Sequence, residues 1–389
     1  MHVMRNLVRR SGVAITGAVL LVAAACSSDS SDSADGSGGA AGAPDDTDTP
    51  YPDADWARGD AAEAGFDPAV LDELAAEAEA AGSNCLIVIR HGELVAEWYW
   101  NGTEPTTNQE VFSATKSYSS TLVGIAQADG DLDVTDPASQ YIPEWVGTPS
   151  EDITVENLVS NNSGRQWSLP IDYSQLIQAP DRTGFAVGLG QDAPPGESWA
   201  YNNSAIQTLD AVLEAATGED PLAFARERLL DPIGMDDSEW TPDNAGNANM
   251  FFGLHSTCED MARFGYLFLH GGNWDGEQIV PEEWVDAATG EPSQELNAAY
   301  GYLWWLNHRG PIGGALQATT AEGGAEDPDG YLVEGAPEDM FWALGLGGQV
   351  IQVDPGSDTI VVRLGPGATE ERYGAAETSK VVTEALVEP

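Results

Sequence analysis

The two ends of the chain have the composition of β-strands, and this arrangement limits the folds that are open to it. Residues 85–90 and 94–99 are apolar, β-branched runs separated by a short polar turn, which predicts a hairpin. Residues 349–353 and 359–363 repeat the pattern around an Asp-Pro-Gly-Ser-Asp turn near the other end. We therefore expect an α/β (α+β) fold whose antiparallel sheet is built from both chain ends.

Between the two hairpins, apolar residues recur at helical spacing. The segments that we expect to be helical are 117–129, 203–217 and 258–269 between the hairpins, 70–81 before the first hairpin and 377–387 after the second. Helices thus fill the middle of the chain, and we expect a helical lobe, at about 117–290, inserted into a sheet that other helices flank.

The first 25 residues have the pattern of a secretion signal. Arg5, Arg9 and Arg10 precede a short run of small apolar residues, which ends at Cys26. Small residues before a cysteine resemble a bacterial lipobox, in which the cysteine is acylated and becomes the mature N-terminus. We expect a lipoprotein signal peptide over 1–25, lipidation of Cys26 and an extracytoplasmic, membrane-anchored protein. Ordinary cleavage without acylation is the alternative.

Residues 26–52 are rich in Ser, Asp, Gly and Ala and have almost no large apolar side chain. Such a segment buries too little surface to offset its ordering entropy, so we expect a flexible acidic tether before a globular domain over 53–389. An oxidising compartment permits a disulfide between Cys85 and Cys258. Their spacing does not establish one, and we expect buried free thiols.

Acidic residues far outnumber basic ones, with 64 Asp+Glu against 15 Lys+Arg and a formal net charge of −49. Phosphate binding needs clustered cations, so this balance argues against nucleic acid as a partner. It also disfavours adhesion to anionic head groups, which leaves the N-terminal anchor as the expected membrane contact. The five His residues show no metal-ligand spacing, and we expect neither a metal nor another cofactor.

A Ser-x-x-Lys sequence, Ser113 to Lys116, opens the apolar helix predicted from residue 117. Residues three apart lie on one helical face, so the two side chains would be neighbours. A serine hydroxyl becomes a good nucleophile when a neighbouring base takes its proton, and a lysine is such a base if burial lowers its pKa. Lys116 is one of only two lysines, the other being Lys380. An N-capping serine beside a solvated lysine is the alternative.

Two further segments contain groups suited to the same chemistry. Tyr201-Asn202-Asn203 has the form Tyr-x-Asn, in which a phenol can share a proton with a lysine and an amide can orient a substrate carbonyl. The segment Gly345-Leu-Gly-Gly-Gln349 enters a strand, where glycines let a substrate approach the backbone closely. A core aromatic, a helix cap and a β-bulge are the structural alternatives.

This ordered set of motifs resembles the serine β-lactamase and D-alanyl-D-alanine peptidase superfamily. The chain looks closest to its class C-like hydrolases and to the aminohexanoate-dimer (nylon-oligomer) hydrolases. Flanking segments that also match are 153–164, 232–240, 256–265, 281–284 and 300–305. The resemblance spans roughly residues 60–385 and implies a β-lactamase/transpeptidase-like fold.

The resemblance also implies roles for the motif residues. Ser113 would be the acyl-accepting nucleophile, Lys116 its activating partner and Tyr201 the general acid/base. The backbone amides of Ser113 and Gln349 would form the oxyanion hole, and Asn203 would occupy the polar third position of the second motif. Gly347 and Gly348 would line the strand beside the substrate.

One departure from the family bears on the substrate. Where β-lactamases have Lys-Thr-Gly on the third strand, this chain has Leu346-Gly347-Gly348. The missing cation would help to hold a substrate carboxylate, so we expect small esters, amides or peptide-like oligoamides as substrates. Arg165 or Arg182 could still supply a cation. β-Lactamase or D-Ala-D-Ala carboxypeptidase activity, and a non-catalytic lipoprotein that binds peptidoglycan peptides, are the alternatives.

Overall fold

The computed structural model describes residues 50–52, 55–366 and 373–387. The expected signal peptide, the lipidation site Cys26 and most of the expected tether lie outside the described residues. All the residues that the structure describes fall within one compact unit, and the boundaries of the inserted lobe stay a prediction. No described helix is both long and apolar enough to cross a bilayer.

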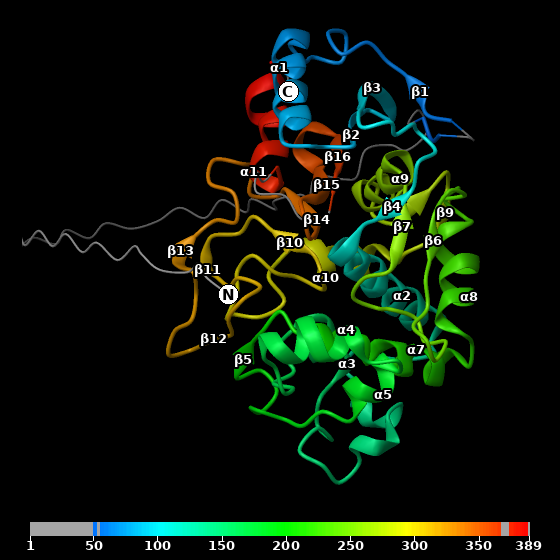
Figure 1. Cartoon of the computed structure of the whole chain (residues 1–389), viewed down its shortest axis with the longest axis vertical. Coiled ribbons are helices and arrows are strands. Elements are labelled where there is room, and N and C mark those ends of the chain that lie inside the picture. Colours follow the sequence, from blue (N-terminus) through cyan, green and yellow to red (C-terminus); the bar gives the residue numbers. More distant parts are fainter. Residues whose placement is uncertain (1–49, 53–54, 367–372, 388–389) are drawn as a thin grey trace, which may run out of the picture. The chain divides into compact units, whose positions relative to one another are not determined.

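The main sheet has seven strands in the order β1-β3-β2-β16-β15-β14-β10 (Figure 1). Both predicted hairpins are present, as β2 (Cys85–Arg90) with β3 (Glu93–Tyr99) and β15 (Gln349–Asp354) with β16 (Thr359–Leu364). Strand β2 also pairs with β16, which joins the two ends of the chain into one sheet. The prediction of a sheet built from both ends is confirmed.

The edges of the sheet refine that prediction. Strand β14 (Phe341–Gly345) pairs antiparallel with β15, and β10 (Trp305–Leu306) follows it at one edge. At the other edge, β1 (Ala57–Arg58) runs parallel to β3, so the sheet is mixed rather than purely antiparallel. The remaining short strands are β4 (Gln109–Glu110), β5 (Ser198–Trp199), β6 (Glu239–Trp240), β7 (Leu254–Ser256), β8 (Asn273–Trp274), β9 (Glu277–Gln278), β11 (Gly310–Ile312), β12 (Thr319–Thr320) and β13 (Asp327–Gly330).

Helices are the commonest regular structure in the segment between the hairpins. The α-helices are α1 (Pro68–Ala80), α2 (Thr115–Asp129), α3 (Val155–Val159), α4 (Leu176–Gln178), α5 (Arg182–Val187), α6 (Asn203–Gln207), α7 (Leu209–Thr217), α8 (Pro221–Ala225), α9 (Cys258–Leu269), α10 (Glu282–Thr289) and α11 (Ala375–Thr378). Short 3₁₀ or π turns are η2 (Phe112–Ala114), η3 (Ala138–Gln140), η4 (Pro143–Trp145), η5 (Ile171–Gln175), η6 (Arg226–Leu230), η7 (Pro355–Ser357) and η8 (Val381–Ala385).

Two predicted helices are interrupted. The segment predicted as one helix over 203–217 forms α6 and α7, which meet at Thr208. There the Thr208 hydroxyl donates to the carbonyl oxygen of Ala205 at 2.6 Å, a side-chain bond that competes with the helical ladder. The closing helix predicted over 377–387 is divided into α11 and the π-helical turn η8.

Side chains on alternate positions of β2 pack on opposite faces of the sheet, as the two-residue period of a strand requires. Leu86 and Val88 join the smaller apolar cluster that contains residues of α1 and η8. Ile87 and Ile89 join the main core, which contains residues of α2 and α9. The sheet is therefore covered on both faces, and the N-terminal end of α2 comes next to β14.

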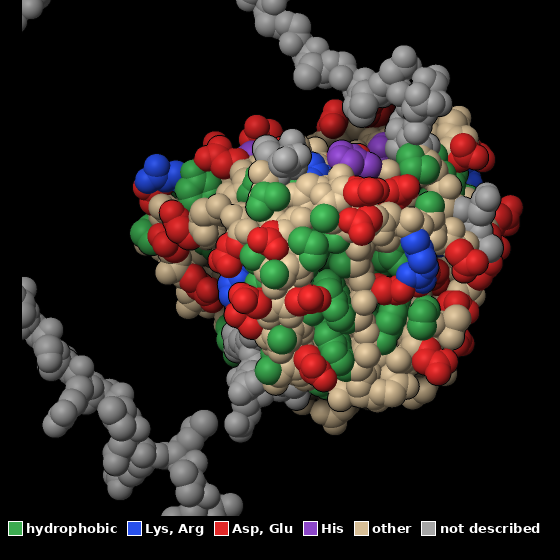
Figure 2. All heavy atoms as spheres, turned by 90° about the horizontal axis from the view of Figure 1, so that it is seen from above, with side chains coloured by type: hydrophobic (Ala, Val, Ile, Leu, Met, Phe, Trp, Pro, Cys, Tyr) green, Lys and Arg blue, Asp and Glu red, His purple; other side chains and the backbone are tan. Residues whose placement is uncertain are grey.

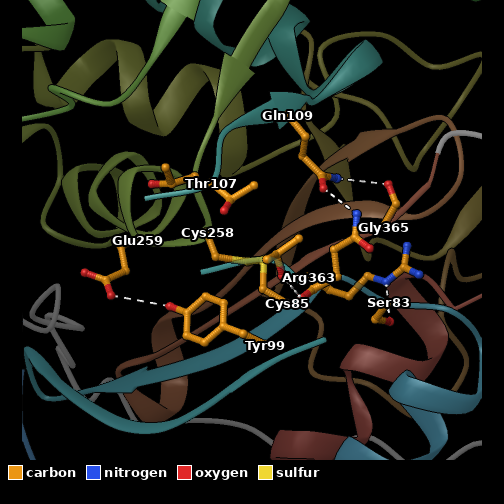
Figure 3. The surroundings of a disulfide bond; sticks show 12 residues. Ser83, Cys85, Tyr99, Thr107, Gln109, Cys258, Glu259, Arg363 and Gly365 are labelled. Carbon is orange, nitrogen blue, oxygen red and sulfur yellow. Dashed lines mark hydrogen bonds between the residues drawn. A yellow bond between two sulfur atoms is a disulfide. The ribbon is translucent and has the colours of Figure 1, made fainter. Parts of the chain in front are cut away.

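A disulfide joins Cys85, the first residue of β2, to Cys258, the first residue of α9 (Figure 3). The expectation of free thiols is therefore wrong. Sequence spacing gave no signal because the two cysteines are 173 residues apart and meet only when α9 packs on the sheet. Beside the bridge, the phenol of Tyr99 donates to the Glu259 carboxylate at 3.4 Å, which links the neighbouring strand β3 to the same helix.

Acidic side chains are spread over the surface. On the face shown in Figure 2, Asp and Glu side chains are distributed among neutral and apolar ones, and few Lys or Arg side chains are visible. Tyr51, near the end of the segment predicted as a tether, contacts the rings of Tyr266 and Trp274 at centroid distances of 5.4 Å. Residue 51, within the segment predicted as a tether, therefore packs against the domain.

Candidate active site

Ser113 lies in a strained turn, residues 110–114, that leads directly into α2. Within this Ser113 turn, Phe112 has a φ of 49°, a left-handed conformation that costs a non-glycine residue about 1–2 kcal/mol. Glu110 stabilises the turn, because its Oε1 accepts hydrogen bonds from the N–H groups of Phe112 at 3.2 Å and Gly253 at 2.8 Å. The turn places Ser113 in the lining of a cavity.

Lys116 follows on the first turn of α2 and is 1% exposed. Its Nζ donates to Oγ of Ser113 at 2.8 Å and to the carbonyl oxygen of Phe251 at 3.1 Å. Burial lowers the pKa of Lys116 well below its usual value, although the charge of Asp172 acts in the opposite direction. The environment therefore favours an uncharged amine next to the serine hydroxyl.

Tyr201 brings a phenol to the same place. The Nζ of Lys116 lies 4.5 Å from the centroid of its ring, and the ring stacks on Trp305 at a centroid distance of 5.6 Å. Burial raises the pKa of Tyr201, and hydrogen bonding with Ser113 and Trp305 opposes the rise. The structure thus brings together the hydroxyl, amine and phenol that the sequence singled out.

Asn203 lines the same cavity, and its Oδ1 accepts no hydrogen bond from any residue that the structure describes. Its backbone N–H donates to Oδ2 of Asp172 at 2.6 Å, and the Ser204 hydroxyl donates to Oδ1 of Asp172 at 2.6 Å. The buried Asp172 carboxylate therefore caps the first turn of α6. Because Tyr173 follows Asp172 directly, this contact also fixes Tyr173 beside the cavity.

The glycine-rich segment forms the turn between β14 and β15. Gly345 and Leu346 line the cavity, whereas residues 347–349 are not part of its lining. The Gln349 side chain is fully buried in the interior, with 0% exposure. A Cβ at Gly345 would overlap the carbonyl oxygen of Val111, so only glycine lets this strand end approach the Ser113 turn so closely.

The cavity has a volume of about 440 Å³ and a mainly apolar lining. Its lining residues are Phe112, Ser113, Tyr173, Ile177, Tyr201, Asn203, Phe251, Phe252, Trp305, Ala315, Leu344, Gly345 and Leu346. Within the described ranges, no lining residue is charged. A mainly apolar pocket with a few convergent polar groups is the usual form of a small-molecule site.

The two arginines that could have supplied a cation are not part of this lining. The buried Arg165 donates to the Ser150 hydroxyl at 2.8 Å and to the carbonyl oxygen of Ala186 at 2.6 Å. The Arg182 guanidinium lies 5.1 Å from the ring centroid of Phe252 and donates to the carbonyl oxygen of Ile177 at 2.8 Å. Arg165 is thus held by residues outside the lining, whereas Arg182 contacts two lining residues, Ile177 and Phe252, without lining the cavity itself.

The reactive groups could be identified from the sequence, whereas the residues that form the walls of the cavity could not. Tyr173, Ile177 and Phe252 lie in segments without a motif, and nothing local marks them as neighbours of Ser113. Glu110 was also missed, being one of 64 acidic residues. Its place three residues before Ser113 was the one available signal.

The sequence matches a known family over most of its length. The model of the Beta-lactamase family covers residues 69–382. This chain belongs to that family. Its β-lactamase-like α/β fold and its place among serine hydrolases that include amidases and esterases agree with the resemblance in the motifs.

Three proteins similar to this β-lactamase-family protein share 16–24% of its sequence. The chain is 24% identical to the 6-aminohexanoate-dimer hydrolase of Paenarthrobacter ureafaciens over 324 residues, which is 76% of this chain and 75% of that protein. A family VIII carboxylesterase shares the fold with a TM-score of 0.63 at 16% identity, covering 84% of this chain and 98% of that one. The penicillin-binding protein homologue of Pyrococcus abyssi, an octamer, aligns with a TM-score of 0.57 at 17% identity, covering 81% and 75%.

Proposed function

We propose that this protein cleaves an ester or amide through an acyl-enzyme formed on Ser113. The observation that carries the proposal is the 2.8 Å hydrogen bond from Nζ of Lys116 to Oγ of Ser113. Because burial lowers the pKa of Lys116 well below its usual value, the environment favours the uncharged amine that can act as a base. A binding protein without catalysis has no need of an activated hydroxyl.

The proposed reaction has two steps. In the first, Oγ of Ser113 attacks the substrate carbonyl carbon while its proton passes to the Lys116–Tyr201 pair. The pair returns a proton to the leaving alcohol or amine as its bond to the acyl carbon breaks. In the second, water attacks the acyl-Ser113 ester, loses a proton to the same pair, and releases the acid as Oγ is reprotonated. The two groups titrate as a pair, so the proton is assigned to both.

Two backbone N–H groups are suited to bind the oxyanion that forms in each step. The N–H groups of Ser113 and Leu346 donate no hydrogen bond to any other described residue, and both residues line the cavity. Donors fixed in advance in a water-poor site stabilise developing negative charge strongly. The sequence pointed instead to Gln349, which pairs with Gly345 across the β14–β15 ladder. We therefore place the second donor at Leu346.

The proposal includes a location outside the cytoplasm, with a lipid on Cys26. Its support is the signal-like sequence before Cys26 and the Cys85–Cys258 disulfide, a bond typical of oxidising compartments. Metabolic labelling with an alkyne fatty acid tests it in the full-length chain. We expect label in the membrane fraction and its loss in Cys26→Ser. Equal labelling of the variant would contradict the anchor.

The catalytic proposal is tested by labelling with a fluorophosphonate and by hydrolysis of p-nitrophenyl acetate. We expect one covalent adduct and ester turnover, both absent in Ser113→Ala. A folded protein that takes no label, or a variant that labels as well as the parent, would overturn the proposal. Nitrocefin and the linear aminohexanoate dimer, assayed in parallel, separate β-lactamase and amidase activity from esterase activity.

A further inference from the structure

We propose that the acyl group accepted by this site is apolar and carries no carboxylate. The inference rests on the proposed acyl-enzyme chemistry and adds the substrate class to it. It follows from three features of the site: the apolar walls, the absence of a charged partner in the cavity lining, and the negative charge of the whole protein.

The residues that form the walls of the cavity come from different parts of the fold. Leu344 and Leu346 belong to β14 and the turn that follows it, while Tyr173 and Ile177 belong to η5 and α4. Trp305 of β10 adds an aromatic face to the same cavity. An acyl chain attached to Ser113 would therefore be surrounded by hydrocarbon and aromatic carbon from several elements.

Three of these wall residues remain open to water. Tyr173 is 42% exposed, Ile177 43% and Leu346 63%, and they are among the few large apolar side chains that the described surface leaves exposed. Apolar groups gathered at the opening of a cavity mark a binding site for an apolar ligand. Each substrate methylene that they bury should improve binding roughly fourfold.

A substrate carboxylate would find no counter-charge in this lining. Lys116 is buried and already bonded to Ser113 and Phe251, and Arg182 is bonded to the backbone of Ile177 and to Oδ1 of Asn249 at 2.9 Å. A charge taken out of water without a partner is strongly disfavoured. An anionic acyl group would therefore bind poorly even where its length fits.

The net charge of the chain also disfavours anionic substrates. A formal charge of −49 gives a negative field that lowers the rate of encounter with anions and leaves neutral molecules unaffected. Acidic side chains are plainly visible over the face in Figure 2. Salt screens such a field, so any reaction with an anionic ester should accelerate as ionic strength rises.

The experiment compares p-nitrophenyl acetate, butyrate and hexanoate with the p-nitrophenyl monoester of adipic acid, which matches hexanoate in chain length and adds a carboxylate. We expect kcat/KM to rise at least about tenfold from acetate to hexanoate, and to be at least about thirtyfold higher for hexanoate than for the adipate ester. Equal rates along the neutral series, or an adipate ester cleaved as well as hexanoate, would overturn the inference.

Two variants test the wall directly. Leu346→Lys places a cation at the opening and should raise the ratio of adipate to hexanoate turnover about tenfold, whereas Val146→Lys, a lysine at an exposed position outside the cavity lining, should leave it unchanged. A Leu346→Lys ratio equal to that of the parent would contradict the inference. So would a selective loss of adipate turnover in Arg182→Gln, because that arginine would then hold the carboxylate.

The outcomes separate this inference from the proposed function. If Ser113 takes a fluorophosphonate and p-nitrophenyl acetate is cleaved without a preference for longer neutral chains, only the substrate class is wrong. If neither labelling nor cleavage of any ester occurs, the acyl-enzyme proposal fails and the substrate class fails with it.

Discussion

The Nζ atom of Lys116 lies 2.8 Å from Oγ of Ser113, and the lysine that makes this contact is 1% exposed. The second acceptor of Nζ is a backbone carbonyl, that of Phe251, and no carboxylate among the described residues is bonded to the amine. Burial removes the water that stabilises the charged form, so a lysine in this environment favours the uncharged amine. The pair is therefore built for proton transfer rather than for an ion pair.

The first prediction concerns the pH dependence of kcat/KM for a neutral ester. Activity should persist at pH values below the usual pKa of a lysine and fall on further acidification, because the Lys116 amine then takes up a proton and no longer serves as a base. Burial lowers the pKa of Lys116 well below 10.5, so the acid limb should lie well below that value. A profile that rises only as the pH approaches 10.5 would contradict this account.

The second prediction concerns Glu110. Its Oε1 accepts the N–H groups of both Phe112 and Gly253, and thereby holds the strained turn that carries Ser113. Glu110→Ala should lower kcat about 10- to 100-fold because the nucleophile loses its alignment, with a smaller change in KM. Glu110→Gln keeps an acceptor oxygen and should recover most of the rate.

The control for this prediction is Glu104→Ala, which removes an exposed carboxylate from the same region. It should leave kcat unchanged. Equal rates for Glu110→Ala and the parent protein would show that the turn keeps its shape without the carboxylate.

The third prediction concerns the disulfide between Cys85 and Cys258. It closes a segment of 173 residues that contains Ser113, Lys116 and Tyr201, and in the chain-entropy account such a closure stabilises the fold by about 5 kcal/mol. The double variant Cys85→Ala, Cys258→Ala should therefore unfold at a distinctly lower temperature and keep its activity in the cold. Reduction of the parent protein should give a similar shift in Tm, and an unchanged Tm in both would argue against the bond.

The fourth prediction concerns Asp210, a buried carboxylate that accepts the Thr183 hydroxyl at 2.7 Å and the N–H of Ala248 at 2.9 Å. Burial raises its pKa from 3.8 to about 6. The folded state thus holds this proton more tightly than the unfolded state, and its contribution is present below pH 3.8 and lost as the pH rises through about 6. The free energy of unfolding should fall by about 1.4 kcal/mol per pH unit for this group in that window.

Asp210→Asn removes this titration, so the slope of the unfolding free energy against pH between pH 4 and 6 should become more positive by about 1.4 kcal/mol per pH unit. Denaturant unfolding at a series of pH values measures it. Asp72→Asn, at an exposed position on α1, also removes one carboxylate and should keep the parent slope. If the Asp210 and Asp72 variants behave alike, overall charge rather than this buried group sets the pH dependence.

The sheet could be predicted because its determinants are local. The β2–β3 and β15–β16 hairpins each consist of two apolar runs around a short turn, and both appear within a residue of the predicted bounds. Four site residues could be predicted for a similar reason, because the residues of a short motif have a fixed spacing in the sequence. They are Ser113, Lys116, Tyr201 and Asn203. The parallel strand β1 has only two residues and pairs by tertiary contact, which leaves no periodic signal.

The walls and the disulfide depend on long-range packing and could not be predicted. Ile177 and Leu346 are far apart in the sequence and meet only at the cavity. Gln349 shows that tertiary packing also limits prediction among residues that are close in the sequence. The motif marks the right turn, but the register of β14 and β15 decides which residue of the turn faces the cavity, and that residue is Leu346.

The most direct test of the central claim is the mass of the protein during turnover. A reaction with p-nitrophenyl hexanoate, quenched in acid within milliseconds and digested, should show a hexanoyl group on the peptide that contains Ser113. The adduct should be absent from Ser113→Ala and strongly reduced in Lys116→Arg, whose guanidinium stays protonated. A hexanoyl group on another residue, or steady turnover with no acylated Ser113 at any time, would contradict the account.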